Sequence, residues 1–453
     1  MIKICKQNQE SVLKKIYKND FDIVTASTSN LVDDIILAMY EQGILECLTS
    51  SIKDKRAHNT TIPFSLVLAL SVAAKMKTRT SLSDIPFAIT DHRVLSKLGY
   101  NVVDTKGGLM RESSLRFLLG KYTAEELFDS YNRTVQDYIM PKLNISPNIH
   151  ILDCTEISVN INNPNYEKAA YTKNKYDEND RGYKLATIRG IVEDTGIIEE
   201  IRFDAMNVHD FKLSEEMLRT TKVFKPGDIL IEDRGFLDRD NINYLKTVRQ
   251  VDTYIPLKTN MIAYDVAVKV AKEENVWEKH PSRRNQKISF VTELGPLWLS
   301  KNPEEDVPLN GCIIWDVNTD EYSVFITTDT EASAKQIIST YELRPEIEED
   351  YRQLKDFWHL QDFKSTKLNM IAYHIIITLF GYMFFQLYTL TPEGEQYAHK
   401  SLPVIIKNYQ PKKLPYIIFY ADNEFAIFSI VEFAKIYTKC CISAQKRLEK
   451  YLC

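Results

Sequence analysis

The spacing of apolar residues changes along the chain near residue 149. Before that point apolar residues recur at helical intervals over Leu31–Leu48, Phe64–Ala74 and Thr123–Ile139. After it they form short runs bounded by polar and turn-forming residues, which is typical of strands. The pattern therefore predicts a mostly helical region over about 1–145, followed by a mixed α/β region.

The second region is predicted to form a layered α/β core. Its expected strands are Ile149–Val159, Tyr183–Val192, Ile197–Met206, Ile229–Ile231 and Thr253–Leu257, and its expected helices are Asp210–Thr220 and Asp238–Val248. The sequence Glu-Asp-Thr-Gly at 193–196 is a hairpin turn signal, and the polar segment 160–181 is predicted to be a loop or flap. The order β-β-β-α-β-α-β indicates a mixed sheet flanked by helices.

Residues 261–328 interrupt this order. The runs Lys287–Leu294, Cys312–Val317 and Tyr322–Thr327 predict strands, so we interpret the segment as a β-rich insertion. Helices are expected to resume at Ala332–Thr340, Pro345–Trp358 and Leu368–Leu390. The predicted domains are a helical region (1–145), a core in two parts (146–260 and 329–395), the insertion (261–328) and a basic helical C-terminal region (396–453).

The most apolar stretch, Met370–Leu390, is predicted to be a core helix. His374 and Gln386 interrupt it, and the uninterrupted part is too short to cross a bilayer. The first residues have no apolar signal core. The seven cysteines are scattered, without zinc-site spacing, which fits a reducing compartment. We therefore expect a cytoplasmic protein with no membrane partner.

The charge balance says little about partners. The net charge of −5 is weak evidence against a nucleic-acid partner. However, residues 51–100 carry eight Lys and Arg against three Asp and Glu, and residues 401–453 carry eight against four. The cations around the middle helices (Lys75, Lys77, Arg79 and Arg93) fit a solvated helix face. They also fit a DNA-end-binding domain with a helix-turn-helix-like element, and composition leaves both interpretations open.

Three acidic residues are the candidates for chemistry. Asp153 lies in the middle of an apolar strand, where an unpaired carboxylate is costly and needs a metal, a cation or hydrogen bonds. Its side chain is expected on the strand face opposite that of Cys154. Asp233 ends another buried strand, while the preceding Glu232 points to the opposite side. Glu348 lies in the first turns of a predicted helix that begins near Pro345.

The helix that carries Glu348 has a cationic face. Tyr341, Arg344, Glu348 and Lys355 are spaced Y-x2-R-x3-E-x6-K, and the last three fall within a narrow arc of one helix face. Taken alone, this pattern is explained by a surface salt bridge between Arg344 and Glu348. Two acids on strands and one on a helix are nevertheless the set that a two-metal phosphoryl-transfer site requires.

With these motifs the sequence resembles the DDE transposases of bacterial insertion sequences, in the class with the Tyr-Arg-Glu-Lys signature. The resemblance covers about 149–390 and includes Asp153 in Ile-Leu-Asp-Cys-Thr and Asp233 in Asp-Arg-Gly-Phe. Pro345 departs from the pattern, because an aromatic residue often follows the arginine. The resemblance implies an RNase H-like fold, with 1–145 as a DNA-binding domain.

The same resemblance implies the chemistry. Asp153, Asp233 and Glu348 would be the catalytic residues and would hold two Mg²⁺ ions, which Mn²⁺ can replace. Tyr341, Arg344 and Lys355 would bind DNA phosphates next to the cut. The substrates would be double-stranded DNA at terminal inverted repeats and target DNA, held by a homodimer at the nucleoid.

Further details of the resemblance stay open. Some members form a DNA hairpin at the element end. A tryptophan of the insertion is expected to stack on a flipped base, and Trp298 and Trp315 are the candidates, although each taken alone is more simply explained as a core aromatic. His209 is interpreted as a helix cap.

Three alternatives remain for the whole chain. The first is a catalytically silent DNA-binding regulator of the same descent. The second is another RNase H-like nuclease that acts on hairpins or RNA. The third is an α/β protein whose acidic residues are structural.

Overall fold

The computed structural model describes the chain except residues 1–4, 28–29, 59, 61, 99–109, 174–176, 194, 295–305, 399, 410–415 and 453. The chain divides into two compact units, Met1–Ser130 with Gln353–Cys453, and Tyr131–Arg352. The boundaries between the two units fall within the residue ranges of α7 (Ala124–Arg133) and α13 (Pro345–Asp356).

The unit Tyr131–Arg352 is built on a mixed sheet. Its core strands lie in the order β6-β5-β3-β7-β8, with β3 parallel to β7 and β7 parallel to β8, while β5 is antiparallel to β3 and β6. These strands are β3 (Ile149–Ser158), β5 (Asn179–Val192), β6 (Thr195–Ala205), β7 (Ile229–Glu232) and β8 (Asp252–Pro256). Each overlaps a predicted strand, so the predicted α/β class is confirmed.

Helices cover the apolar faces of this sheet. One cluster joins Leu152, Ile188 and Leu230 of the strands to Met217 of a helix and Leu245 of a helical turn. The covering elements are η2 (Thr134–Ile139), α8 (Met140–Leu143), α9 (Asp210–Thr220), η3 (Arg234–Phe236), α10 (Arg239–Tyr244) and η4 (Leu245–Arg249). The bounds of α9 are those predicted, because its amphipathic pattern and its cap are both local. His209 is the N-cap, and its Nδ1 accepts a hydrogen bond from the Phe211 N–H.

The insertion continues the same sheet. Strand β12 (Glu321–Thr327) pairs antiparallel with β8, and β11 (Leu309–Asp316), β10 (Gln286–Leu294) and β9 (Glu278–Lys279) follow outward. The segment is not strand alone, since α11 (Ile262–Glu274) packs its alanines against these strands. The predicted flap also contains a short strand, β4 (Ala170–Lys173), which pairs with β5. Helix α12 (Ala334–Tyr341) then leads to α13.

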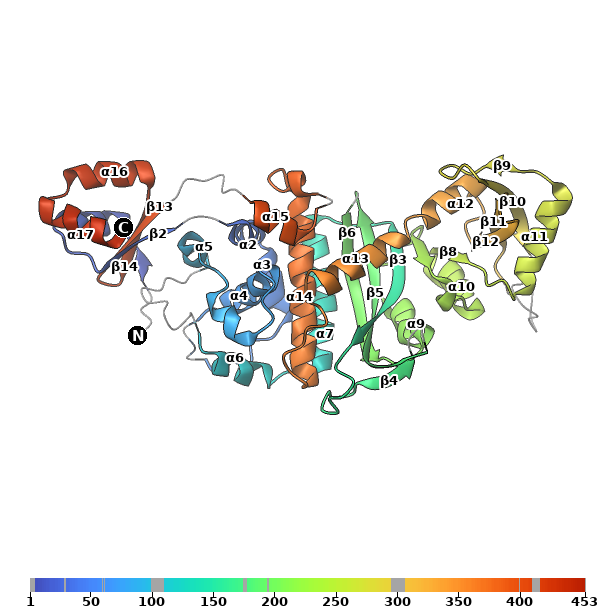
Figure 1. The fold of residues 1–453 in the computed structure, drawn as a ribbon, viewed down its shortest axis with the longest axis horizontal. Helices are drawn as coiled ribbons and strands as arrows, with labels where there is room; N and C mark the ends of the chain where they lie inside the picture. Colours follow the sequence, from blue (N-terminus) through green and yellow to red (C-terminus); the bar gives the residue numbers. More distant parts are fainter. Residues whose placement is uncertain are drawn as a thin grey trace. The chain divides into compact units, whose positions relative to one another are not determined.

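The other unit contains a helical cluster around α14 (Leu368–Thr389). This helix is long and apolar enough to span a membrane by length and composition, but 83% of its most apolar window is buried. It packs against α4 (Phe64–Met76), as the prediction of a core helix requires (Figure 1). The other helices of the cluster are α2 (Leu31–Glu41), α3 (Ile44–Ser51), η1 (Leu82–Phe87), α5 (His92–Lys97), α6 (Glu112–Leu119), η6 (Glu395–Tyr397) and α15 (Leu402–Asn408). The predicted helix Leu31–Leu48 is divided at Gly43, whose φ of 70° breaks helical geometry.

The two ends of the chain share a four-stranded sheet, which corrects the prediction of a helical C-terminal region. Its order is β1-β14-β13-β2, so strands from the first 27 residues pair with strands after residue 415. The strands are β1 (Lys6–Gln7), β2 (Ile23–Ser27), β13 (Tyr416–Ala421) and β14 (Glu424–Ser429), and the helices beside them are α1 (Gln9–Tyr17), α16 (Ile430–Lys439) and α17 (Ile442–Leu452). The pairings of β1 with β14 and of β2 with β13 join distant segments, so local periodicity did not reveal them, whereas β13 and β14 form a local hairpin that the prediction missed.

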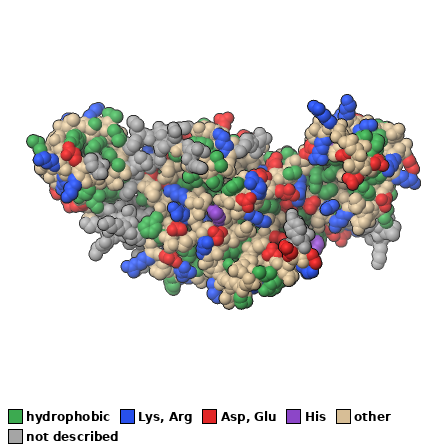
Figure 2. All heavy atoms as spheres, viewed as in Figure 1, with side chains coloured by type: hydrophobic (Ala, Val, Ile, Leu, Met, Phe, Trp, Pro, Cys, Tyr) green, Lys and Arg blue, Asp and Glu red, His purple; other side chains and the backbone are tan. Residues whose placement is uncertain are grey.

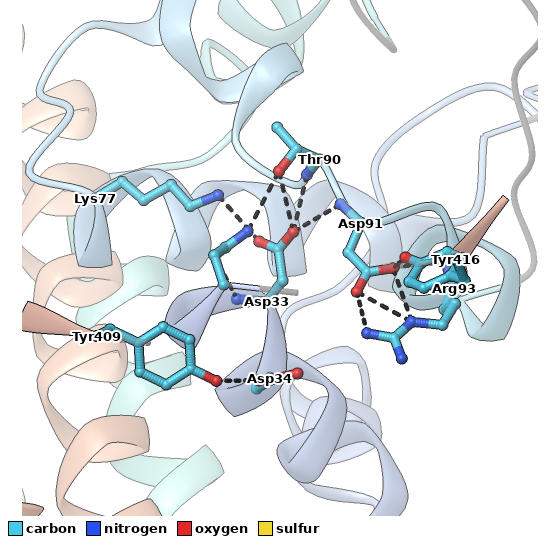
Figure 3. A network of polar contacts seen from close by, with 9 residues as sticks. Asp33, Asp34, Lys77, Thr90, Asp91, Arg93, Tyr409 and Tyr416 are labelled. Atoms are coloured by element: carbon cyan, nitrogen blue, oxygen red, sulfur yellow. Dashed lines mark hydrogen bonds and ion pairs between the residues drawn. The ribbon is translucent and has the colours of Figure 1, made fainter. Parts of the chain in front are cut away.

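Buried carboxylates form ion pairs with two of the four cations, Lys77 and Arg93, for which a solvated helix face was one interpretation. Asp33 is fully buried and accepts hydrogen bonds from the Asp91 N–H at 2.7 Å and from Lys77 Nζ at 3.0 Å (Figure 3). Asp91, equally buried, pairs with Arg93 at 2.7 Å. Lys75 is itself buried, whereas Arg79 is exposed. A solvated face is therefore the wrong interpretation for three of the four residues.

Candidate functional site

Two of the candidate acids lie at the same edge of the sheet. Leu152 of β3 is in register with Glu232 of β7, and the two strands are parallel. The next residues, Asp153 and Asp233, therefore stand level where β7 ends. Carboxyl ends of neighbouring parallel strands are a common place for ligand-binding groups. The sequence predicted this neighbourhood, and the register accounts for it.

Arg344 joins the three candidate acids. Its Nη2 lies 3.0 Å from Asp153 Oδ2 and 3.9 Å from Asp233 Oδ2. Its Nη1 donates a hydrogen bond to Glu348 Oε1. The i,i+4 salt bridge of the simplest interpretation is thus present, but it is one arm of a four-residue cluster drawn from β3, the end of β7 and α13.

The cluster perturbs the ionisation of Asp153. Its side chain is 12% exposed, against 38% for Asp233 and 57% for Glu348. Burial is the largest cause that raises the pKa of Asp153, Arg344 and the Cys154 N–H oppose it, and the charges of Asp233 and Glu348 add smaller increases, so that the pKa is about 6. A strongly perturbed carboxyl beside other carboxyls is typical of functional sites.

Tyr341 also belongs to this neighbourhood. Its ring contacts that of Phe325, with the centroids 4.7 Å apart. Burial raises the pKa of Tyr341 to about 12, and Asp233 is the next largest cause. Lys355 lies seven residues beyond Glu348 on α13 and is half-buried. Its role toward DNA stays a prediction.

Buried polar contacts that the sequence reasoning missed fix α13 against the sheet. The Tyr351 hydroxyl donates to the backbone oxygen of Asp153 at 2.8 Å and lies 2.7 Å from Thr187 Oγ1. Arg189 of β5 is buried and pairs with Asp350 at 2.6 Å and Glu346 at 2.9 Å. Arg189 lies in the apolar run of a predicted strand. Because burying an unpaired charge is costly, its position there could have indicated a buried ion pair.

Comparison with known protein families gives a match over the region that contains the three acids. A family model described as "Transposase DDE domain" matches residues 146–384, a little over half of the chain, and this range contains Asp153, Asp233 and Glu348. The chain belongs to the DDE transposase family. Membership implies DNA binding, and enzymes of the family typically depend on divalent metal ions. No curated protein matches the chain.

The acids of this transposase fit a divalent metal by donor chemistry. Carboxylate oxygens are the ligands that Mg²⁺ and Mn²⁺ prefer, and three carboxylates converge on one guanidinium here. Among the described residues, no three His, Cys, Asp or Glu side chains stand close enough together to hold an ion as they are. Arg344 is the cation among the acids in this structure, and a metal ion would have to take its place.

The face drawn in Figure 2 shows no single basic patch among its described residues. On the face drawn in Figure 2, Lys and Arg side chains are interspersed with Asp and Glu over the described residues. This agrees with the net charge of −5. Any contacts with DNA phosphates on this face therefore depend on local groups of cations rather than on one broad basic surface.

Of the two tryptophan candidates for base stacking, Trp298 lies outside the described residues. Trp315 stacks on Tyr322 with the ring planes 6° apart, and its Nε1 donates to Asp320 at 2.9 Å. Lys287 lies over the Trp315 ring. These contacts give Trp315 partners within the insertion, and a role toward DNA stays a prediction.

Proposed function

We propose that this DDE transposase belongs to the Tyr-Arg-Glu-Lys class of bacterial insertion sequences. It would cut DNA at the ends of the element and join the 3′ ends to target DNA. The convergence of Asp153, Asp233 and Glu348 on one cation, within the matched family domain, carries this proposal. The sequence elements that supply these acids are separated by up to 195 positions, so a local surface salt bridge does not account for the cluster.

In this proposal Asp153, Asp233 and Glu348 hold two Mg²⁺ ions, or Mn²⁺ in their place. When bound, the two ions would lower the pKa of the attacking hydroxyl and neutralise charge at the leaving oxygen. The protein's own contribution is to hold the three carboxylates. The parallel register of β3 and β7 sets the two aspartates level, and the buried contacts of Tyr351 and Arg189 set the position of the helix that carries Glu348.

Arg344 can bind either the three carboxylates or a DNA phosphate. Without metal it neutralises part of the negative charge of the three carboxylates, which would otherwise repel one another. Its planar guanidinium is also suited to bidentate contact with a DNA phosphate. We propose that Arg344 leaves the acids and binds a DNA phosphate beside the cut. Tyr341 and Lys355 would contact the same stretch of DNA. A homodimer would hold the two paired ends of the element.

The test is cleavage of a duplex that carries the terminal repeat found beside the gene, in Mg²⁺ or Mn²⁺. The wild type is compared with Asp153→Asn, Asp233→Asn and Glu348→Gln, and DNA binding is measured for each. Cleavage at the repeat boundary by the wild type, lost in all three variants with binding retained, is the expected result. Binding without cleavage by the wild type would favour the silent regulator, and cleavage confined to hairpins or RNA would favour another nuclease.

A further inference from the structure

A cavity in the helical unit has an unusual lining. It has a volume of about 120 Å³ and lies among α4, the start of η1, α6, residues 363–365 and α14. A single water needs roughly 10–15 Å³ measured in this way, so the cavity has room for a group the size of a phosphate. The residues that line it include three cations, Lys75, Arg116 and Lys364, and no Asp or Glu is among them.

Lys75 is the innermost of these cations. The residue is 6% exposed, and its Nζ lies 2.8 Å from Nδ1 of the buried His374. The other ring nitrogen of His374 lies 3.0 Å from the backbone oxygen of His359. A carbonyl oxygen can only accept, so Nε2 carries the proton and Nδ1 is the acceptor for Lys75.

Among the described residues, no carboxylate forms a direct ion pair with Lys75. A neutral imidazole accepts a hydrogen bond but supplies no negative charge, and burying an unpaired ammonium group is costly. Burial accordingly lowers the pKa of Lys75 to about 7, although Asp362 and Asp84 act in the opposite direction. Burial and the neighbouring Lys75 lower the pKa of His374 well below its ordinary value, which keeps the ring neutral. An anion in the cavity would supply the missing charge.

The outer part of the cavity is also suited to an anion. Arg116 and Lys364 have side chains 55% and 52% exposed, and each is paired with an exposed carboxylate, Glu112 and Asp362 respectively. Exposed ion pairs of this kind contribute little and exchange readily. The hydroxyl groups of Thr80, Ser81 and Ser365 also line the cavity, and hydroxyls are common donors to phosphate oxygens.

We propose that this cavity binds a phosphate group of the DNA backbone, with Lys75 at its base and Arg116 and Lys364 at its mouth. The choice of DNA as the source rests on the transposase function proposed above. The site is separate from the acids of the catalytic unit, and it gives Lys75 a function that neither the solvated-face interpretation nor the catalytic site provides. Because it contacts the backbone alone, it would position DNA of any sequence.

The test uses the full chain and compares Lys75→Met with the rim variant Arg116→Gln/Lys364→Gln. The control is Lys14→Gln/Lys269→Gln, which removes two exposed helical lysines that are likewise paired at i,i+4. Affinity for a terminal-repeat duplex and for a scrambled duplex is measured over a range of salt concentrations. In parallel, inorganic phosphate is tested for its ability to raise the melting temperature of each variant.

The expected result is about a tenfold loss of affinity in both cavity variants, equal for the two duplexes. For each lost phosphate contact the slope of log affinity against log salt should fall by about 0.9. The control should keep the affinity and slope of the wild type. If Lys75→Met fails to fold, the rim variant, whose changes are exposed, decides the question by the same criteria.

Two results would overturn the proposal. If the wild type binds the duplexes and the cavity variants bind them equally well, the cavity does not contact DNA. If inorganic phosphate stabilises the wild type and not the variants while duplex binding is unchanged, the cavity takes a free anion instead. Failure of the transposase function looks different, since the wild type itself would then bind the terminal duplex without cleaving it, or would not bind it at all.

Discussion

At the scale of single residues, Arg344 carries the most information about the site. It was expected to contact DNA phosphates or to pair with Glu348, and in the structure it contacts Asp153 and Asp233 as well. The three acids could be predicted from sequence because each lies at a recognisable place on a strand or helix. The shared guanidinium could not, because it depends on how α13 packs across the edge of the sheet.

Tyr351 is predicted to position Asp153. In Tyr351→Phe the Asp153 backbone oxygen loses a donor and the Thr187 hydroxyl loses a buried partner. A loss of about 1–3 kcal/mol in the free energy of unfolding is expected, to be measured by urea denaturation. DNA cleavage should fall through kcat rather than KM. An unchanged kcat with the expected loss of stability would show that Tyr351 is only structural.

His150 is predicted to make the unit Tyr131–Arg352 less stable at high pH. Its ring nitrogens lie 2.7 Å from Glu199 and 3.1 Å from Asp228. Burial alone lowers the pKa of His150, but the hydrogen bonds with the two carboxylates raise it to about 9, above its ordinary value of 6.5. The stabilisation is therefore complete below about pH 6.5 and is lost as the pH rises through 9.

The effect of His150 on stability must be measured locally, because Lys75 in the other unit has the opposite effect on stability. The pKa of Lys75 is lowered, so its contribution to the free energy of unfolding rises with pH. Hydrogen exchange of β3 peptides, corrected for intrinsic rates, reports the opening free energy of the strand. That free energy should fall between pH 6.5 and 9. A constant or rising value would contradict the charged state assigned to His150.

At the scale of elements, the sequence could predict helices and strands that follow from a local pattern. It could not predict pairing between segments that are distant in the chain. Strand β7 and helix α9 follow from short runs whose period or caps are unambiguous. Strand β2 was missed because its partner β13 lies some 390 positions away. Strands β13 and β14 pair with each other as a local hairpin, and the sequence reasoning overlooked that local pattern. Helix α11 was missed inside a segment whose strands dominated the pattern. The same distinction applies to the site, where Arg189 and Asp350 meet only in the folded unit.

The ion pairs of Arg189 are predicted to fix α13 on β5. In Arg189→Met the carboxylate of Asp350, which is 5% exposed, loses its closest cation. Removing one partner of a buried pair costs about 3–5 kcal/mol. Arg352→Gln is the matched control, because Arg352 pairs with Glu349 at the surface and should cost about 0–1 kcal/mol. Equal losses in chemical denaturation would contradict the anchoring role.

At the scale of the whole molecule, the two units differ in how they are assembled from the chain. One unit is a continuous segment, Tyr131–Arg352, whereas the other combines Met1–Ser130 with Gln353–Cys453. The buried helix α14 belongs to the second segment and packs against α4 of the first. Neither segment has its full core alone, and the four-stranded sheet is divided between them in the same way.

This division predicts how fragments behave. Residues 131–352 should fold alone with cooperative unfolding, because the sheet and its apolar clusters lie within that segment. Residues 1–130 alone should aggregate or remain unfolded, and co-expression with 353–453 should restore a folded complex. Circular dichroism and gel filtration of the fragments test this. A monomeric, cooperatively folded 1–130 would contradict the shared core.

The central claim is that Glu348, with the two aspartates, serves metal-dependent DNA cleavage. The most direct test compares Glu348→Gln with Glu349→Gln, its neighbour on the same helix, in Mg²⁺-dependent cleavage of the terminal duplex. Both residues are exposed acids; Glu348 pairs with Arg344 of the cluster, whereas Glu349 pairs with Arg352. The account predicts that Glu348→Gln binds the duplex but does not cleave it, while Glu349→Gln cleaves like the wild type. Cleavage by both variants at the wild-type rate would contradict it.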